Sequence, residues 1–342
     1  MIEARLYDKL DADRVRCNLC AHRCHINSGA KGICQVRENR AGTLYSLVYG
    51  LAISANVDPI EKKPLFHFKP GSTAFSVATA GCNFRCSFCQ NADISQMPRD
   101  RQRLEGRDLA PETLVKTAVA QHCASMAYTY TEPTIFYEYA YDTAVLAKQA
   151  GVANVFVSNG YMTSEMINSM TPPDSPVLLD AANIDLKAFH NSFYHEQCGA
   201  SLQPVLDSLI QLKKRGVWLE VTTLLIPGLN DSEEELRELA QFLMRELGPE
   251  TPWHVTRFHP TYKLIDRPRT PIETLHRARS IGQAEGLLFV YVGNLPGDDG
   301  ENTLCPHCRR VVIQRSGYTI SYYHLKESQC EYCGTAIAGV GL

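Results

Sequence analysis

Residues 73–91 have the sequence TAFSVATAGCNFRCSFCQN, which joins an apolar run to a cysteine-rich loop. The apolar run is typical of a buried β-strand. Cys82, Cys86 and Cys89 follow it in the spacing C-x3-C-x2-C. Gly81 has no side chain, so the backbone can leave the strand there and approach a bound group closely. This stretch therefore predicts a strand that presents three thiols from its carboxyl end.

Strand-like and helix-like segments alternate from this strand to about residue 294. We expect strands at residues 73–79, 125–130, 154–157, 183–186, 217–225, 253–258 and 288–292. We expect helices at residues 111–122, 133–150, 202–215 and 232–247, a short one capped by Thr163, and one from Pro271. This alternation predicts an α/β fold with a parallel sheet and right-handed crossovers. The span is short for a closed eight-unit barrel, so we predict a partial, open TIM-like barrel.

Residues 1–70 and 296–342 lie outside the alternation, and each segment has its own group of cysteines. Segments this short need staples such as bound metals to fold. We therefore predict a Cys-rich N-terminal segment at 1–70, a core partial barrel at 71–295, and a zinc-ribbon-like C-terminal segment at 296–342.

Composition narrows the class of protein. The 342 residues carry a net charge of −3, which provides no basic field for nucleic acid. No apolar stretch has the length of a membrane span, and the N-terminus lacks the apolar region of a signal peptide. We therefore expect a cytoplasmic protein that binds neither nucleic acid nor a membrane. Because the cytosol keeps thiols reduced, clustering among the 13 cysteines indicates metal ligation.

The three cysteines of the loop suit a 4Fe–4S cluster. Three thiolates can hold three of its irons and leave the fourth iron open to another ligand. Zinc is the alternative, but zinc knuckles usually supply C-x2-C pairs that add up to four ligands. A non-catalytic iron–sulfur electron carrier would normally saturate its cluster with four protein ligands. The pattern therefore favours an enzyme, since barrel enzymes place their chemistry at the carboxyl ends of the strands.

Polar residues follow the apolar runs of the other strands, and we expect them to gather at the same end of the sheet. The candidates to bind a charged small molecule there are Glu132, Asn159, Asp185, Lys187 and His259. Each has a structural alternative. Glu132 could instead cap the helix that starts at residue 133, and Asp185 and Lys187 could form an ion pair. Asn159 could instead only stabilise a turn, and His259 could cap the end of a strand.

The sequence C-x3-C-x-aromatic-C after the first strand resembles the radical S-adenosylmethionine (SAM) superfamily, with Phe88 as the aromatic residue. The resemblance implies that SAM binds the open iron through its amino and carboxylate groups. Reductive cleavage then gives a 5′-deoxyadenosyl radical that abstracts hydrogen from a substrate. The resemblance also implies adenine contacts around Phe88 and an amino contact from Glu132, although Tyr130 and Thr131 replace the usual glycine pair.

Two narrower resemblances follow. Residues 184–187 and 258–259 are similar to SAM-contacting segments of pyruvate formate-lyase activating enzymes. Residues 17–24, 45–50 and 58–65 resemble the radical SAM member of the AmmeMemoRadiSam system. This implies association with Memo-like and AMMECR1-like proteins, and an electron donor such as flavodoxin or ferredoxin. We expect an oxidoreductase acting on a small molecule, with glycyl-radical formation on a partner protein as the alternative.

Two C-x2-C knuckles lie near the C-terminus and contain Cys305, Cys308, Cys330 and Cys333. Four thiolates suit a structural zinc ribbon, and the β-rich spacer suits a hairpin between the knuckles. An auxiliary iron–sulfur cluster is the second choice.

The N-terminal segment has four cysteines within 18 residues. They are Cys17, Cys20, Cys24 and Cys34, with His22 and His25 as further ligand candidates. This density implies a metal, but spacing does not separate zinc from an auxiliary iron–sulfur cluster. Of the remaining cysteines, we expect Cys123 to be a core residue and Cys198 to be a packed loop thiol.

Overall fold

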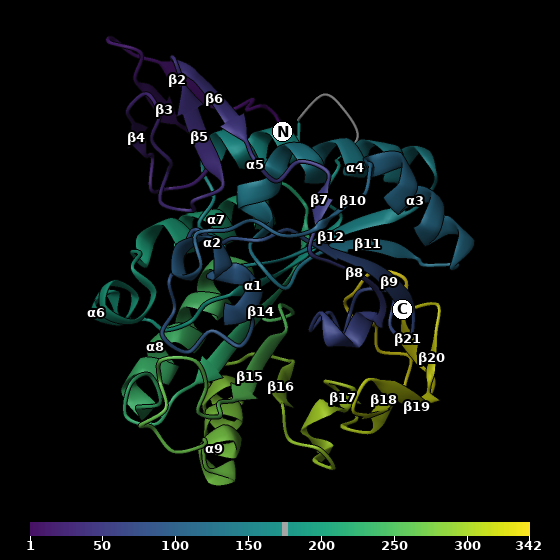
Figure 1. The fold of residues 1–342 in the computed structure, drawn as a ribbon. Helices are drawn as coiled ribbons and strands as arrows, with labels where there is room; N and C mark the ends of the chain where they lie inside the picture. Colours follow the sequence, from purple (N-terminus) through teal and green to yellow (C-terminus); the bar gives the residue numbers. More distant parts are fainter. Residues whose placement is uncertain (173–176) are drawn as a thin grey trace.

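The computed structural model describes residues 1–172 and 177–342, and a largely parallel sheet occupies its centre (Figure 1). Its strand order is β16-β15-β14-β13-β12-β11-β9-β8. The strands are β8 (Ser54–Pro59), β9 (Thr73–Ala78), β11 (Ser125–Tyr128), β12 (Ala153–Ser158), β13 (Ala181–Asp185), β14 (Trp218–Leu225), β15 (Trp253–Arg257) and β16 (Val290–Gly293). Every neighbouring pair is parallel except β8 and β9. The predicted parallel α/β sheet is therefore confirmed.

Helices alternate with these strands as the sequence predicts. The longer ones are α3 (Pro111–Ala120), α4 (Tyr137–Gln149), α5 (Ser164–Met170), α7 (Gln203–Lys214), α8 (Glu233–Phe242) and α9 (Ile272–Ala284). The short helices α1 (Ala92–Ser95), α2 (Met97–Asp100) and α6 (Asn191–Phe193) lie in loops. Thr163 and Ser232 accept hydrogen bonds from the backbone N–H groups of Met166 and Glu235, which fixes the starts of α5 and α8.

The N-terminal segment contains small antiparallel sheets. One has the order β1-β6-β5 and another the order β2-β3-β4. Their strands are β1 (Ile2–Glu3), β2 (Tyr7–Lys9), β3 (Val15–Cys17), β4 (His25–Ile26), β5 (Arg37–Arg40) and β6 (Thr43–Ser46). Beyond them, β7 (Leu51–Ala52) pairs with β10 (Arg107–Asp108), and β8 joins the central sheet. The predicted boundary at residue 70 thus needs correction for β8, because this strand belongs to the sheet rather than to an appendage.

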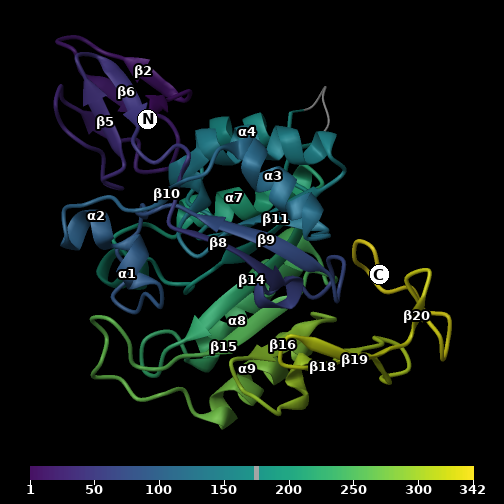
Figure 2. The same cartoon turned by 45° about the vertical axis from the view of Figure 1, so that its right-hand side comes forward.

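The C-terminal segment is also β-rich. It contains β17 (Thr303–Leu304), β18 (Val311–Ser316), β19 (Thr319–Tyr323), β20 (Leu325–Lys326) and β21 (Gln329–Cys330). The antiparallel pair β18 and β19 is the hairpin expected between the two cysteine knuckles. In both views, the N-terminal strands (purple) and the C-terminal strands (yellow) lie on opposite sides of the central sheet (Figure 1, Figure 2).

The C-terminal segment packs at the amino ends of the parallel strands. The guanidinium of Arg315 donates to the Phe66 carbonyl at 2.8 Å, and the Lys69 N–H donates to the Val340 carbonyl at 2.7 Å. Because residues 66–72 lead into the start of β9, these contacts place the segment away from the loop that carries Cys82. Within the described residues, none of the helices has the length and apolar character needed to cross a bilayer.

Candidate functional site

The loop that follows β9 is held by backbone contacts from distant parts of the chain. The N–H groups of Arg85 and Ser87 donate to the carbonyls of Cys198 and Gln197, each at 2.9 Å. The Ser87 carbonyl in turn accepts from the N–H of Leu264 at 3.0 Å. These bonds fix the loop against residues that follow β13 and β15. Its three cysteines are therefore presented at the carboxyl ends of the strands, as predicted.

Gly81 is required for a reason that the sequence did not reveal. Its φ of 106° is unfavourable for other residues, and a Cβ atom there would lie 2.7 Å from Cγ1 of Val36. Because Gly81 has no side chain, the N-terminal segment can pack directly against the loop. The expected purpose, close approach to a bound group, stays a prediction.

The three thiols lie in different surroundings. Cys86 is buried, whereas Cys82 and Cys89 are partly accessible. The Sγ atom of Cys89 lies 3.2 Å from the hydroxyl of Ser95, and the Sγ atom of Cys82 accepts from the Phe84 N–H at 3.4 Å. Burial raises the pKa of Cys82 well above its usual value. A hydrogen bond from the Cys198 thiol lowers the pKa of Cys86.

Cys198 lies closer to this site than the sequence suggested. It is fully buried and ends a π-helical turn, Tyr194–Cys198, directly after α6. Such turns are frequent at functional sites. The predicted burial of this thiol is confirmed, but its neighbour is Cys86 in the loop of residues 79–91, which we call the cluster loop. No spacing rule connects residue 198 with residue 86, so sequence reasoning missed this contact.

Glu132 is a buried carboxylate that joins the ends of β11 and β12. Its Oε1 accepts from the backbone N–H of Thr134 at 3.0 Å and from the Ser158 hydroxyl at 2.7 Å. Its Oε2 accepts from the Asn159 N–H at 2.8 Å. Burial raises the pKa of this carboxyl. The structural alternative, a cap at the start of the following helical turn, is thus present, and the contact with SAM stays a prediction.

Asn159 lies directly beside the cluster loop. Its amide Nδ2 donates to Oδ1 of Asn83 at 2.8 Å and lies 4.0 Å from the sulfur of Cys82. Its Oδ1 accepts from the Tyr161 N–H at 3.0 Å, so it also shapes the turn that the sequence allowed. The structure therefore brings Asn159, Glu132 and Cys82 together.

Asp185 and Lys187 form the ion pair that was the structural alternative, with 3.0 Å between Nζ and Oδ2. The same Nζ lies 5.8 Å from the ring centroid of Phe88, which is buried in the cluster loop. This pair is therefore also at the predicted site. His259 is exposed, and in the described part of the chain its side chain has no hydrogen bond. The structure does not link it to the other candidates.

A buried lysine was not anticipated. Lys63 is 1% exposed and donates to Oδ2 of Asp58 at 2.7 Å. Its Nζ lies 4.4 Å from the ring centroid of Tyr130, whose hydroxyl donates to the same carboxylate. Burial lowers the pKa of Lys63 to about 8. The backbone of Tyr130 accepts a hydrogen bond from Asn91, two residues after Cys89, so Tyr130 connects this amine to the predicted site.

The loop fits an iron–sulfur cluster better than a single ion. Across residues 1–172 and 177–342, one group of metal-binding side chains has all its ligand atoms within 4.8 Å, and it lies at Cys305, Cys308, Cys330 and Cys333. The cysteines of the loop are not part of that group. A 4Fe–4S cube, which spreads its thiolates around several irons, suits a donor set of three thiols and leaves one iron open.

The C-terminal cysteines are compact. The sulfur atoms of Cys305 and Cys333 are 3.6 Å apart, and those of Cys308 and Cys330 are 3.8 Å apart. A zinc–sulfur bond of about 2.3 Å in a tetrahedron gives a sulfur–sulfur distance of about 3.8 Å. These four residues can therefore hold an additional metal.

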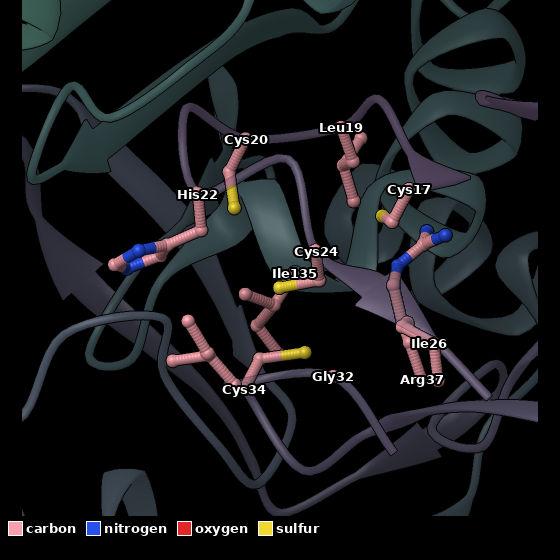
Figure 3. Close-up of a pocket in the computed structure, with 11 residues that line it drawn as sticks. Cys17, Leu19, Cys20, His22, Cys24, Ile26, Gly32, Cys34, Arg37 and Ile135 are labelled. Atoms are coloured by element: carbon pink, nitrogen blue, oxygen red, sulfur yellow. The ribbon is translucent and has the colours of Figure 1, made fainter. Parts of the chain in front are cut away.

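The N-terminal cysteines Cys17, Cys20, Cys24 and Cys34 line one cavity (Figure 3). The two candidate histidines do not complete this set. The Nε2 atom of His22 is hydrogen-bonded to the Asn83 carbonyl at 2.9 Å, and His25 is exposed. Cys123 is buried near α3, as expected of a core residue.

Comparison with known proteins agrees with this geometry. Residues 76–243 match the Radical SAM superfamily, and the chain belongs to this superfamily. The chain is 46% identical to an uncharacterized protein of Methanocaldococcus jannaschii over 339 residues, which cover 98% of this chain and 99% of that one. It is 25% identical to the pyruvate formate-lyase-activating enzyme of Clostridium pasteurianum, over 48% of this chain and 66% of the enzyme.

A solved structure shares the fold. It is a radical SAM methyltransferase from Sphaerobacter thermophilus, with a TM-score of 0.51 and 19% sequence identity, covering 66% of this chain and 67% of that one. The chain is thus a radical SAM protein similar to pyruvate formate-lyase activating enzymes. This membership supports a 4Fe–4S cluster and SAM as cofactors and SAM-derived radical chemistry as the activity.

Proposed function

We propose that the protein is a cytoplasmic radical SAM oxidoreductase that generates a 5′-deoxyadenosyl radical and abstracts hydrogen from a small molecule. The observation that carries the proposal is the loop after β9, whose three thiols share one end of the sheet with Asn159 and the pair Asp185–Lys187. We infer that the open eight-stranded sheet curves into the partial barrel typical of such enzymes. A reduced 4Fe–4S cluster, when bound, supplies the electron that cleaves the sulfonium of SAM.

The protein side chains bind and orient SAM in this proposal. Asn159 lies beside Cys82 and has its amide fixed by Asn83, so it can contact the ribose or carboxylate of SAM. Lys187, held by Asp185 near Phe88, provides a cation for the carboxylate. Glu132 offers a buried negative charge for the amino group. His259 is exposed, so its contact would require SAM to reach the rim of the site.

The buried polar group at Lys63 supports a small substrate. Its amine, the Asp58 carboxylate and the Tyr130 phenol lie together, and the Tyr130 carbonyl accepts a hydrogen bond from Asn91 in the loop after β9. Such a buried cation and hydroxyl suit a compact anionic molecule better than a segment of another protein. Similarity to the pyruvate formate-lyase-activating enzyme favours the second candidate, glycyl-radical formation on a partner protein. Memo-like and AMMECR1-like proteins are proposed partners, and flavodoxin or ferredoxin is the proposed electron donor.

The C-terminal group is proposed to be a structural zinc ribbon. Its sulfur–sulfur distances match a tetrahedral zinc site, and its position at the amino ends of the strands is remote from the cluster loop.

Cleavage of SAM tests the proposed activity. The anaerobically reconstituted and reduced protein should release methionine and 5′-deoxyadenosine. Cys86→Ala should abolish release, whereas Cys123→Ala, a buried cysteine outside the three groups, should leave it largely intact. Unimpaired cleavage by Cys86→Ala would contradict the assignment.

Glu132→Gln tests the contact with the amino group of SAM. Losing a charge-assisted partner in a desolvated site should weaken SAM binding by roughly 2–4 kcal/mol. The melting temperature, measured in parallel, reports how much the substitution destabilises the fold. A lower melting temperature with unchanged SAM affinity would assign this carboxylate to the helix cap alone.

Deuterium transfer tests the class of substrate. The reduced enzyme and SAM are incubated with size-fractionated extract from its own organism grown in deuterated medium. Deuterium in 5′-deoxyadenosine should follow the small-molecule fraction. Label that follows only a large protein, together with a glycyl radical on that protein, would establish the second candidate.

A further inference from the structure

The four N-terminal cysteines surround one apolar cavity. Cys17 ends β3, Cys20 and Cys24 lie in the following turn, and Cys34 lies between β4 and β5. Leu19, Ile26 and Ile135 complete its apolar wall. In the close-up the four sulfur atoms face its interior, whereas the ring of His22 turns away from them (Figure 3). The donor set at this cavity is therefore four thiols.

The arrangement of these thiols differs from that of the C-terminal set. The tetrahedron around a single zinc brings its sulfur atoms to about 3.8 Å from one another. Cys305, Cys308, Cys330 and Cys333 satisfy that condition, and among the described residues they are the one set whose ligand atoms all lie within 4.8 Å. The N-terminal thiols line a cavity instead. Four cysteines can ligate either a 2Fe–2S or a 4Fe–4S cluster.

A buried arginine at the same cavity favours a negatively charged occupant. Arg37 lines the cavity, is 1% exposed, and pairs through one Nη with the buried carboxylate of Glu138. Its Nε and its other Nη have no hydrogen-bond partner in the described part of the chain. Buried N–H donors without partners are costly. An iron–sulfur cluster with four thiolates carries net negative charge, and its sulfur atoms can accept those hydrogen bonds.

This cavity adjoins the loop of the SAM site. The Nε2 atom of His22 lies 2.9 Å from the carbonyl oxygen of Asn83, the residue after Cys82. On the other side of the loop, a Cβ atom built on Gly81 would lie 3.3 Å from the carbonyl oxygen of Cys34. The two groups of cysteines are thus joined by one hydrogen bond and by direct backbone packing.

We propose that Cys17, Cys20, Cys24 and Cys34 hold a second iron–sulfur cluster that passes single electrons to the cluster at Cys82, Cys86 and Cys89. A one-electron donor of the flavodoxin or ferredoxin class is oxidised by one electron, and the N-terminal cluster is reduced. That electron then moves to the cluster of the SAM site, which returns the N-terminal cluster to its oxidised state. The relay role rests on the proposed function, whereas the presence of the cluster does not.

Metal analysis of a variant without the SAM-site cysteines tests the site. The Cys82→Ala/Cys86→Ala/Cys89→Ala protein is reconstituted anaerobically with iron and sulfide. It should retain roughly half of the wild-type iron and sulfide if the N-terminal cluster is 4Fe–4S, and roughly a third if it is 2Fe–2S. The matched Cys17→Ala/Cys20→Ala/Cys34→Ala variant should lose that same share. Hydrogen exchange at β9, β11 and β12, measured in both variants, reports whether the central sheet is folded.

Two outcomes would overturn the cluster. One is a second zinc in place of iron in the variant without the SAM-site cysteines. The other is wild-type protein whose iron content is fully lost with Cys82, Cys86 and Cys89. Neither readout uses SAM cleavage. A failed activity assay would therefore not affect the test of the N-terminal cluster.

Electron paramagnetic resonance tests the relay. Two reduced clusters in packed neighbouring sites broaden each other's signals, so the reduced wild-type spectrum should differ from the sum of the two variant spectra. Reduction by flavodoxin should also be at least tenfold slower at the SAM site when Cys17, Cys20 and Cys34 are replaced. A wild-type spectrum equal to that sum, with an unchanged rate of reduction, would refute the relay.

Discussion

The two four-cysteine groups at the ends of the chain have the same donors and different geometry. The C-terminal thiols belong to two knuckles joined by the hairpin of β18 and β19, and pairs of sulfur atoms approach to 3.6 and 3.8 Å. The N-terminal thiols come from several turns and line a cavity. In both groups the number of thiol ligands indicates a bound metal. The backbone that carries these ligands determines how large the bound metal or cluster can be.

The groups also differ in position. The C-terminal group lies at the amino ends of the parallel strands, where Arg315 contacts Phe66. The N-terminal group lies at their carboxyl ends, where His22 contacts Asn83. Carboxyl ends are where barrel enzymes carry out chemistry, and amino ends serve stability. We therefore expect loss of the first group to affect folding locally and loss of the second to affect redox behaviour.

Removal of the zinc proposed at the C-terminal cysteines should have the largest effect on stability. Structural zinc contributes roughly 10–16 kcal/mol to the folding of small domains. Cys330→Ala should therefore unfold residues 303–342 and raise their hydrogen exchange, while amides of β3 and β5 stay protected. Cys123→Ala is the matched control. Equal loss of protection at both ends of the chain would contradict the separation of the two regions.

Replacing Arg37 should have the next largest effect. Arg37→Met leaves the buried Glu138 carboxylate without its cation, which should lower the free energy of unfolding by about 3–5 kcal/mol. Arg40→Met, which removes an exposed pair with Glu38, should cost less than about 1 kcal/mol. Urea denaturation of both variants checks this. Similar costs would show that the charge at the N-terminal cavity is not structurally required.

Acid should weaken the C-terminal interface by a smaller amount. Burial lowers the pKa of His67 to about 4, and its ring contacts the Ala338 carbonyl and the Tyr291 hydroxyl. The unfolded chain then binds the proton near pH 6.5, so stability is complete above that pH and falls as the pH drops toward 4. The loss between pH 6.5 and 5 should be about 2 kcal/mol.

Denaturation of the wild type and of His67→Gln across this pH range isolates the effect. The variant should lose less stability than the wild type, whereas His25→Gln, at an exposed position, should behave like the wild type. Identical pH profiles for all three proteins would exclude His67 as the acid-sensitive group.

Local sequence signals predicted much of the fold and the centre of the site. The apolar run of β9, the caps Thr163 and Ser232, and the spacing of Cys82, Cys86 and Cys89 depend on neighbouring residues alone. β8 was missed because a short antiparallel edge strand containing Asn56, Asp58 and Pro59 lacks a strong strand pattern.

Features that depend on distant contacts were not predictable. Lys63 is buried because Asp58 and the Tyr130 ring surround its amine, and nothing near it in the sequence indicates burial. Cys198 reaches Cys86 through a π-helical turn. The arrangement of the N-terminal thiols around one cavity likewise follows from the fold of this segment rather than from their spacing in the sequence.

The backbone bonds of the cluster loop have a consequence for synthesis of the chain. Arg85 and Ser87 find their partners at residues 197 and 198, and Ser87 also accepts from Leu264. A nascent chain therefore cannot close this loop until residues far downstream have left the ribosome. We expect Cys82, Cys86 and Cys89 to stay open to iron–sulfur delivery proteins through most of translation, and cluster insertion to precede final closure of the loop.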